Sequence, residues 1–266
     1  MNHQNKLISA VLLGTAMVAG PALGLDRPQT PLDDPYRSGM LDYMQVELLG
    51  DPEAITFDDR VVVMAPATAE DSFHVPVTVD ATAIPNVEQI TLFVDYGPIP
   101  HILDFYPEAV DARLSFRFKI DQATPVRAAV KTTDGQWYLG STRIDAAGGG
   151  CTAPAAAYAS DDWEEHLGEV RGRMWADTGR VRVIVDHPMD TGLADGIPVF
   201  IGEELALEDE AGTRLARVDL SEPVNEDPAF TFHLAENHPA GPLRISGRDN
   251  NGNEIDATIP VGNLTQ

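Results

Sequence analysis

An alternation of apolar and polar residues with a period of two most constrains what this chain can fold into. The clearest run alternates four apolar side chains with three polar ones: Leu114, Ser115, Phe116, Arg117, Phe118, Lys119 and Ile120. Because residues two apart lie on the same face of a strand, this pattern predicts a strand with one buried face and one solvent-facing side. Similar runs recur at residues 75–79, 126–130, 137–141, 181–185, 230–233 and 255–261, and the mostly apolar residues 90–94 also predict a strand.

Turn residues separate these runs. Asp134-Gly135 and Asn251-Gly252 are typical of tight β-hairpins, and Ala211-Gly212 predicts another turn. Short strands with turn signals every 8–12 residues or so are typical of β-sandwiches. We therefore expect an all-β protein with two β-sandwich domains in tandem, at residues 51–147 and 166–266, each large enough for its own core.

Two short helices are expected beside the sandwiches. Residues 25–50 predict an irregular arm followed by a helix over 36–49, in which Met40, Leu41, Met44 and Leu48 follow a helical spacing and Gly50 ends the helix. Ser160, with Glu164 after it, predicts the N-cap of an inter-domain helix that runs to about Met174.

The first 24 residues have the pattern of a secretory signal peptide. Lys6 provides a basic start, residues 7–19 are mostly apolar, and small residues precede a cleavage point after about Gly24. A membrane anchor is the alternative, but the run is shorter than the roughly 20 apolar residues that span a bilayer. We expect an exported, soluble, periplasmic protein.

Charge and cysteine content exclude several classes. The chain has 42 acidic and 18 basic side chains, a formal charge of −24, and one cysteine. Nucleic acids and anionic membranes need a basic face, so neither is an expected partner, and no membrane insertion is expected. One thiol makes neither an internal disulfide nor a cysteine-based zinc site.

Cys151 is the position with chemical interest. It follows Gly148, Gly149 and Gly150 in a segment of small residues, 148–165, which predicts an exposed, flexible linker. No lysine or histidine lies beside it in sequence, so an ordinary pKa near 8.5 leaves only a few per cent thiolate at neutral pH. That is poor for a catalyst but acceptable for a carrier that partner enzymes activate. The alternative is an unimportant linker residue.

The same stretches resemble a known family. The first half resembles SoxY, the sulfur-carrier subunit of bacterial thiosulfate oxidation, in Val75–Val79, Ile90–Asp95, Pro125–Val130 with Asp134-Gly135, and the Gly148–Cys151 arm. The second half resembles SoxZ, the partner subunit, in the stretch His187-Pro188-Met189-Asp190-Thr191-Gly192. The order is similar to that of the fused SoxYZ-like carriers associated with quinoprotein dehydrogenases.

This resemblance implies two immunoglobulin-like β-sandwiches and a cysteine, here Cys151, that holds sulfur intermediates covalently on a swinging arm. In SoxY the cysteine lies in a Gly-Gly-Cys-Gly-Gly motif at the free C-terminus. Here Thr152, Ala153, Pro154 and a second domain follow it, so we expect the thiol on a loop. His187, Met189 and Asp190 are expected to form a turn at the interface between the domains, where Asp190 and Thr191 bond backbone groups.

Other sites are weaker alternatives. Six of the seven histidines, together with the seven methionines, suggest copper as an alternative, but they form no close cluster in sequence, so no metal is expected. Residues 249–254 hint at a calcium loop, but they lack the twelve-residue spacing and fit a hairpin turn better. No glycine-rich phosphate loop is present, and no cofactor is expected.

Two functions remain open. The first is a periplasmic carrier without turnover of its own, which presents a sulfur-containing intermediate on Cys151 to redox or sulfur-oxidation enzymes. The second is a non-covalent accessory or docking protein of a periplasmic quinoprotein (PQQ-dependent) dehydrogenase, which would associate through its charged surfaces.

Overall fold

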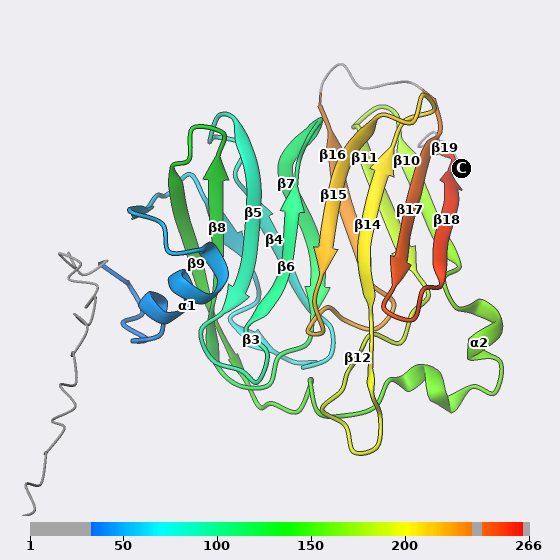
Figure 1. Cartoon of the computed structure of the whole chain (residues 1–266), viewed down its shortest axis with the longest axis horizontal. Coiled ribbons are helices and arrows are strands. Elements are labelled where there is room, and N and C mark those ends of the chain that lie inside the picture. The colour runs from blue at the N-terminus through cyan, green and yellow to red at the C-terminus, as the bar shows by residue number, and fades with distance from the viewer. Residues whose placement is uncertain (1–32, 236–240, 263–266) are drawn as a thin grey trace, which may run out of the picture. The chain divides into compact units, whose positions relative to one another are not determined.

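Two β-sheets packed face to face make up the body of the protein. The computed structural model describes residues 33–235 and 241–262, so the predicted signal peptide and the start of the predicted arm lie outside the described residues (Figure 1). The first half consists of one helix and nine strands: α1 (Leu41–Leu49), β1 (Ile55–Phe57), β2 (Val62–Met64), β3 (Thr68–Ala69), β4 (Val75–Asp80), β5 (Val87–Val94), β6 (His101–Tyr106), β7 (Val110–Phe118), β8 (Thr124–Thr132) and β9 (Trp137–Ala146).

The second half begins with two helical turns and is otherwise built from strands. Its elements are η1 (Ala156–Ala159), α2 (Trp163–His166), β10 (Val170–Trp175), β11 (Arg180–Val185), β12 (Asp190–Thr191), β13 (Val199–Phe200), β14 (Gly202–Glu208), β15 (Arg214–Leu220), β16 (Ala229–Leu234), β17 (Leu243–Asp249), β18 (Glu254–Ile259) and β19 (Val261–Gly262). The expected all-β class with short N-terminal and inter-domain helices is confirmed.

The two halves share both sheets. Among the described residues, one sheet has ten strands in the order β1-β9-β8-β5-β6-β15-β14-β17-β18, with β3 beside β9, and the other has seven in the order β19-β10-β11-β16-β7-β4-β2. The junctions are the antiparallel pairs β6–β15 and β7–β16, which place Phe105 opposite Val218 and Leu114 opposite Phe232. The edge strands of the two sandwiches therefore hydrogen-bond to each other in both layers.

The hydrophobic core is likewise continuous. One cluster of buried side chains includes Val77, Leu92 and Leu114 from the first half and Val183 and Val218 from the second. The separate cores expected for the two halves are thus a single packed interior. The alternation predicted for residues 114–118 holds, because Leu114, Phe116 and Phe118 face this interior.

A smaller cluster seats the N-terminal helix on the outer face of the larger sheet. Leu41, Met44 and Leu49 of α1 pack on Phe93 and Trp137. The helix ends as predicted at Gly50, whose φ of 70° is in the left-handed region that glycine adopts without steric cost. Helix α1 is shorter at its start than the expected span of 36–49.

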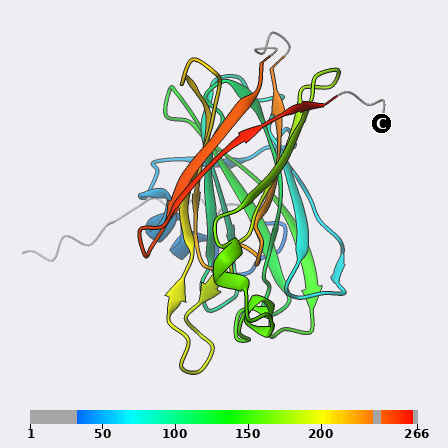
Figure 2. The ribbon, with the colours of Figure 1, turned by 90° about the vertical axis from the view of Figure 1, so that its right-hand side faces the viewer.

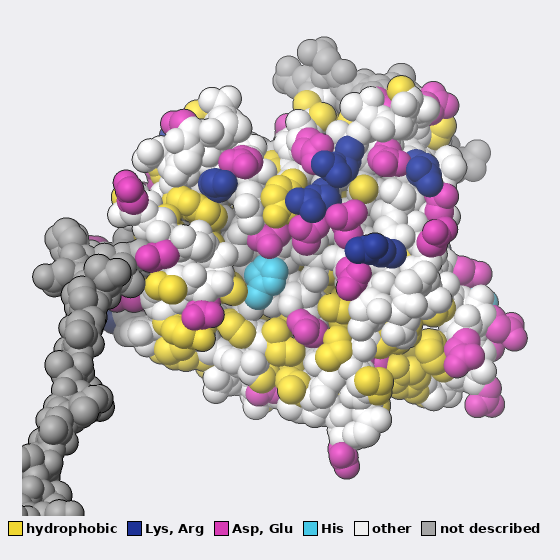
Figure 3. Space-filling model, viewed as in Figure 1, with side chains coloured by type: hydrophobic (Ala, Val, Ile, Leu, Met, Phe, Trp, Pro, Cys, Tyr) yellow, Lys and Arg dark blue, Asp and Glu magenta, His cyan; other side chains and the backbone are white. Residues whose placement is uncertain are grey.

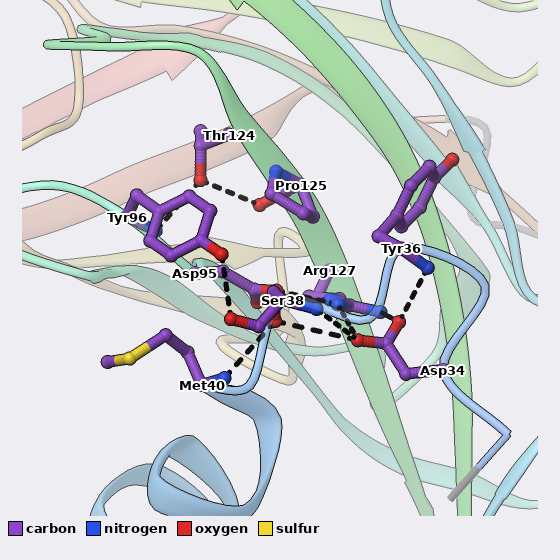
Figure 4. Close-up of polar contacts among 9 residues, drawn as sticks. All are labelled: Asp34, Tyr36, Ser38, Met40, Asp95, Tyr96, Thr124, Pro125 and Arg127. Atoms are coloured by element: carbon purple, nitrogen blue, oxygen red, sulfur yellow. Dashed lines mark hydrogen bonds and ion pairs between the residues drawn. The ribbon is translucent and has the colours of Figure 1, made fainter.

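A buried arginine anchors the chain that leads into α1. Arg127 is fully buried and pairs with both Asp95, at 2.6 Å, and Asp34, at 2.7 Å. In Figure 4 the Arg127 side chain reaches from β8 between these two carboxylates. Tyr96 adds a hydrogen bond from its hydroxyl to the carbonyl oxygen of Ser38 at 2.7 Å. These contacts hold the segment before α1 against the sheet.

The turns follow the sequence, whereas the second helix does not. The predicted turns at Gly135, Gly212 and Gly252 join β8 to β9, β14 to β15 and β17 to β18. The helix expected to run from Ser160 to Met174 is wrong: α2 covers only Trp163–His166, and residues 170–175 form β10. They pair with all of β11, and this pairing outweighs the local helical signal.

The surface carries many acidic side chains. On the face in Figure 3, basic groups gather over the strands of the second half and lie among acidic ones. The ion pairs of the second half include Arg217 with Asp219, Arg244 with Asp256 and Arg248 with Glu203. Within the described ranges, the chain contains no helix long and apolar enough to cross a membrane.

Candidate functional site

The cysteine arm crosses one end of the sandwich from the first half to the second. It leaves the end of β9 at Ala146 and reaches η1 at Ala156. Figure 1 shows this stretch along the lower edge, and Figure 2 shows that the β12–β13 hairpin projects from the same end. Sequence segments about 40 residues apart therefore meet here, because Cys151 contacts Thr191.

The expectation of an exposed thiol is wrong. Cys151 is only 3% exposed. Its Sγ lies 3.7 Å from the carbonyl oxygen of Lys119, to which the thiol donates, and its own carbonyl oxygen accepts a 2.5 Å hydrogen bond from Thr191 Oγ1. Local sequence composition describes a solvated linker, but tertiary packing against both halves covers the side chain.

Burial also changes the acidity of the thiol. It raises the pKa of Cys151 to about 11, with a further upward effect of Asp121 that Lys119 partly opposes. At neutral pH the docked side chain is therefore a neutral thiol. Because the thiolate is the nucleophilic form, Cys151 is unreactive while it lies in this position.

The glycines before Cys151 have a packing role in this state. A Cβ on Gly150 would lie 2.1 Å from the carbonyl oxygen of Ser72 and 2.7 Å from that of Ile120, and one on Gly148 would lie 2.3 Å from that of Asp121. The Gly150 N–H donates to the Ile120 carbonyl oxygen at 3.1 Å. Backbone approach at these distances requires residues without a side chain.

The His187–Asp190 turn contacts the first half of the chain, because the Met189 carbonyl oxygen accepts a hydrogen bond from Lys119 Nζ. His187, Met189 and Asp190 are all buried. The His187 Nδ1 accepts a hydrogen bond from the Met189 N–H at 3.0 Å, and its Nε2 lies 3.6 Å from Asp249 Oδ2. Burial lowers the pKa of His187 to about 4, so the ring is neutral at physiological pH.

Two carboxylates of the second half hold the linker that follows Cys151. Asp190 accepts from the Ala155 N–H at 3.3 Å and from the Tyr158 hydroxyl. Glu226 accepts from the N–H groups of Ala156, at 2.7 Å, and Ala157, at 2.6 Å. These bonds to backbone N–H groups fix the chain on the C-terminal side of Cys151.

Sequence reasoning missed Lys119. The alternation 114–120 places it on the solvent side, yet its side chain is 6% exposed. Strand β7 ends at Phe118, and a loop of the second half covers the next residues: Phe118 bridges Val224, and the Lys119 N–H donates to the Pro223 carbonyl oxygen at 2.6 Å. In the sequence, the one indication that Lys119 is buried is its place between two apolar residues, Phe118 and Ile120.

A small pocket lies beside the site. It has a volume of about 180 Å³, and its lining includes Trp163, His166, Arg171, His187 and Asp227. Cys151 does not line it. In the ranges 33–235 and 241–262, His, Cys, Asp and Glu side chains form no group of three or more that could hold a metal ion, and residues 249–253 form the β17–β18 turn.

Family comparisons match both halves of the chain. A model described as sulfur oxidation protein SoxY matches residues 45–151, and one described as sulphur oxidation protein SoxZ matches residues 171–260. The first match ends at Cys151, and the second contains the His187–Asp190 turn. A search of curated proteins gave no match.

Solved structures give looser likenesses. The sulfur carrier protein SoxY from Chlorobium limicola f thiosulfatophilum is 23% identical, with a TM-score of 0.36, over 41% of this chain and 92% of that one. A proposed superoxide reductase from Thermotoga maritima is 15% identical, with a TM-score of 0.32, over 35% and 93%. The two family matches, in this order within one polypeptide, show that the chain belongs to the fused SoxYZ-like family.

Proposed function

We propose that this protein is a periplasmic carrier that holds a sulfur-containing intermediate covalently on Cys151 and presents it to partner enzymes. The SoxY and SoxZ matches support a carrier role in sulfur oxidation, without turnover of its own. The proposal includes the domain limits expected from the sequence. These are a SoxY-like half at residues 51–147, a linker at 148–165 that contains Cys151, and a SoxZ-like half at 166–266.

The observation that carries the proposal is the position of Cys151. The single cysteine of the chain lies where the SoxY match ends, and the SoxZ-like half contacts it through Thr191. A structural cysteine needs no such contact. A carrier thiol benefits from it, because an exposed thiol is oxidised or captured in an oxidising compartment before a partner is met.

The arm then works in two positions. In the docked position, burial keeps Cys151 protonated and inert. Loading and unloading require the arm to leave the end of the sandwich, where the thiol regains an ordinary pKa and enters the active site of a partner. Gly148 and Gly150 serve both positions, since they allow close packing when docked and a thin, mobile chain when released, and Gly149 adds to the mobility of the released chain.

The decisive experiment is the mass of the Cys151 peptide from protein isolated from its native host without reductant. A carrier shows adducts heavier than the free thiol, and reductant removes them. A homogeneous free thiol in cells that are oxidising sulfur compounds, together with full function of a Cys151→Ser strain, would overturn the proposal. Cys151→Ala is the matched second variant, because it removes the thiol without adding a hydroxyl.

A second candidate function is the non-covalent accessory protein of a periplasmic quinoprotein dehydrogenase. The buried thiol favours it, because a cysteine that never leaves the docked position is a packing residue. This function predicts association that weakens with salt, as expected for a chain with a charge of −24, and no response to Cys151→Ser. A pull-down at low and high salt, with both forms of the protein, separates the two functions.

The periplasmic location rests on the signal peptide expected in the first 24 residues. Fusing these residues to a reporter that is active only after export tests it. N-terminal sequencing of the native protein checks the cleavage after Gly24, and a mature chain that still begins at Met1 would contradict it.

A further inference from the structure

Lys119 joins three segments that would otherwise be separate at the end of the sandwich. Its carbonyl oxygen accepts from the Cys151 thiol, its N–H donates to Pro223, and its Nζ donates to the carbonyl oxygen of Met189. Pro223 and Met189 belong to two different loops of the second half. The buried residue Lys119 therefore contacts the cysteine arm and both of these loops.

The positive charge of the Lys119 side chain acts on two nearby carboxylates, in addition to the backbone hydrogen bonds of this residue. Burial lowers the pKa of its ammonium group, while the negative charges of Asp190 and Glu226 act in the opposite direction. These same carboxylates accept hydrogen bonds from the backbone N–H groups of Ala155, Ala156 and Ala157. The ammonium thus offsets the charge of the two groups that bind the linker after Cys151.

Removing the positive charge of Lys119 leaves negative charges at this end of the sandwich without a cation to offset them. Asp190 is buried, and Asp121, whose charge raises the pKa of Cys151, accepts a hydrogen bond from the Gly149 N–H at 3.3 Å. Without a cation, the acidic groups are left in a medium that stabilises charge poorly, so water must enter or the covering segment must move away. The arm is held at this place by hydrogen bonds with Lys119, Thr191 and Asp121, and by close backbone packing at Gly150.

We propose that Lys119 is a positioning residue that keeps the Cys151 arm docked, and that its ammonium group controls how often the thiol becomes accessible. The control is exerted through Asp190 and Glu226 on the linker and through Met189 on the turn beneath it. This inference concerns accessibility of the thiol and stands apart from the identity of any cargo.

The test measures alkylation of Cys151 by iodoacetamide in the folded protein, followed by the mass of the Cys151 peptide. Wild type is compared with Lys119→Met, which keeps an unbranched chain of similar length without the charge. The control is Lys131→Met in β8, where a half-buried lysine pairs with Glu88 at 3.3 Å. We expect Lys119→Met to react at least tenfold faster than wild type and Lys131→Met to react at the wild-type rate.

A pH profile separates positioning from general loosening. In wild type the reaction is limited by opening of the docked arm, whereas in Lys119→Met the thiol should titrate near the ordinary value of about 8.5. Urea unfolding of the same samples, with Ile245→Val as a variant weakened in the core, shows whether faster alkylation follows global stability. Ile245→Val should lower the unfolding midpoint and leave alkylation slow.

Two results would overturn the inference. One is a Lys119→Met protein that is folded and alkylated at the wild-type rate. The other is faster alkylation in Ile245→Val and Lys119→Met alike, in proportion to their losses of global stability. If Lys119→Met does not fold, Lys119→Gln provides the same comparison, since its amide can still donate to Met189 but carries no charge. None of these outcomes depends on whether the native protein carries sulfur.

Discussion

Thr191 of the second half donates a hydrogen bond from its side-chain hydroxyl to the backbone carbonyl oxygen of Cys151, at 2.5 Å. The donor belongs to the SoxZ-like turn, and the acceptor is the last residue of the SoxY-like match. The contact therefore holds the arm through its backbone and leaves the sulfur atom free of any role in it. Docking by this bond does not depend on the chemical state of the thiol.

Replacing Thr191 by valine, which has nearly the same shape, should loosen the arm. A hydrogen bond of this kind contributes about 1 kcal/mol, and a buried acceptor left unsatisfied costs more. We expect Cys151 to be alkylated about five- to tenfold faster in Thr191→Val, measured by peptide mass. Urea unfolding should show a loss of global stability below about 2 kcal/mol. An unchanged alkylation rate would show that this bond does not hold the arm.

Cys151→Ser should be folded and nearly as stable as wild type. The serine hydroxyl can donate to the Lys119 carbonyl oxygen as the thiol does, so the buried position keeps its partner. We expect the free energy of unfolding in urea to change by less than about 1 kcal/mol, while the proposed carrier function is lost. A loss of several kcal/mol would instead indicate that Cys151 is mainly a core residue.

Adjacent glycines offer a matched pair for the docked arm. In Gly150→Ala the new methyl group meets backbone oxygens of Ser72 and Ile120, whereas in Gly149→Ala it meets nothing within 4 Å. Gly149 has a φ of 89°, so its substitution costs about 1 kcal/mol of backbone strain. We expect Gly150→Ala to expose Cys151 to alkylation far more than Gly149→Ala. Equal rates would mean that close packing of Gly150 is not needed.

The Arg127 cluster should be sensitive to loss of the arginine. Arg127→Met leaves Asp95, which is 1% exposed, without its ion pair, and breaking a buried pair on one side costs about 3–5 kcal/mol. We expect a loss of this size in urea unfolding, with little dependence on salt. Asp34→Asn should cost less and mainly increase proteolysis before α1, because Asp34 lies at the edge of the cluster. A strong salt dependence would contradict the burial of the pair.

His187 should make stability depend on pH. Its pKa is about 4 in the folded protein and near 6.5 in the unfolded chain, so between these values the unfolded state binds more protons. The contribution of the neutral ring is complete above pH 6.5 and is lost as pH falls towards 4, by roughly 3 kcal/mol. The difference in unfolding free energy between wild type and His187→Asn, measured from pH 7 to 4, isolates this effect from the carboxylates. A constant difference would contradict it.

The sequence predicts where the strands and turns of this protein lie better than it predicts which strands pair with each other. The alternation at Leu114 and Phe116 identifies the buried face of β7, and Asn251-Gly252 identifies a hairpin, because both signals are local. That β7 pairs with β16 of the other half is not local information. Alternation with a period of two identifies the buried face of a strand, but it does not identify the strand that pairs at its edge.

The candidate site shows the same division. The cysteine and the His187–Asp190 turn are identifiable from residue types and their order, and the structure brings them together. The burial of Cys151 and of Lys119 could not be predicted, because Cys151 is covered through contacts with Lys119 and Thr191, and Lys119 through a loop around Pro223 at the end of β7. Glycines before Cys151 indicate conformational freedom in sequence, whereas here Gly148 and Gly150 also allow two backbones to touch.

Because the arm is continuous with η1, Cys151 is tethered on both sides. The stretch between Ala146 and Ala156 can extend by about 3.3–3.6 Å per residue, and a loop that must return reaches at most half its contour, roughly 17 Å from the sandwich. Under the proposed carrier function, a partner must therefore offer an entrance wide enough for a doubled chain and a reaction centre no deeper than that reach. A narrow tunnel suited to a single free chain end would exclude this cysteine.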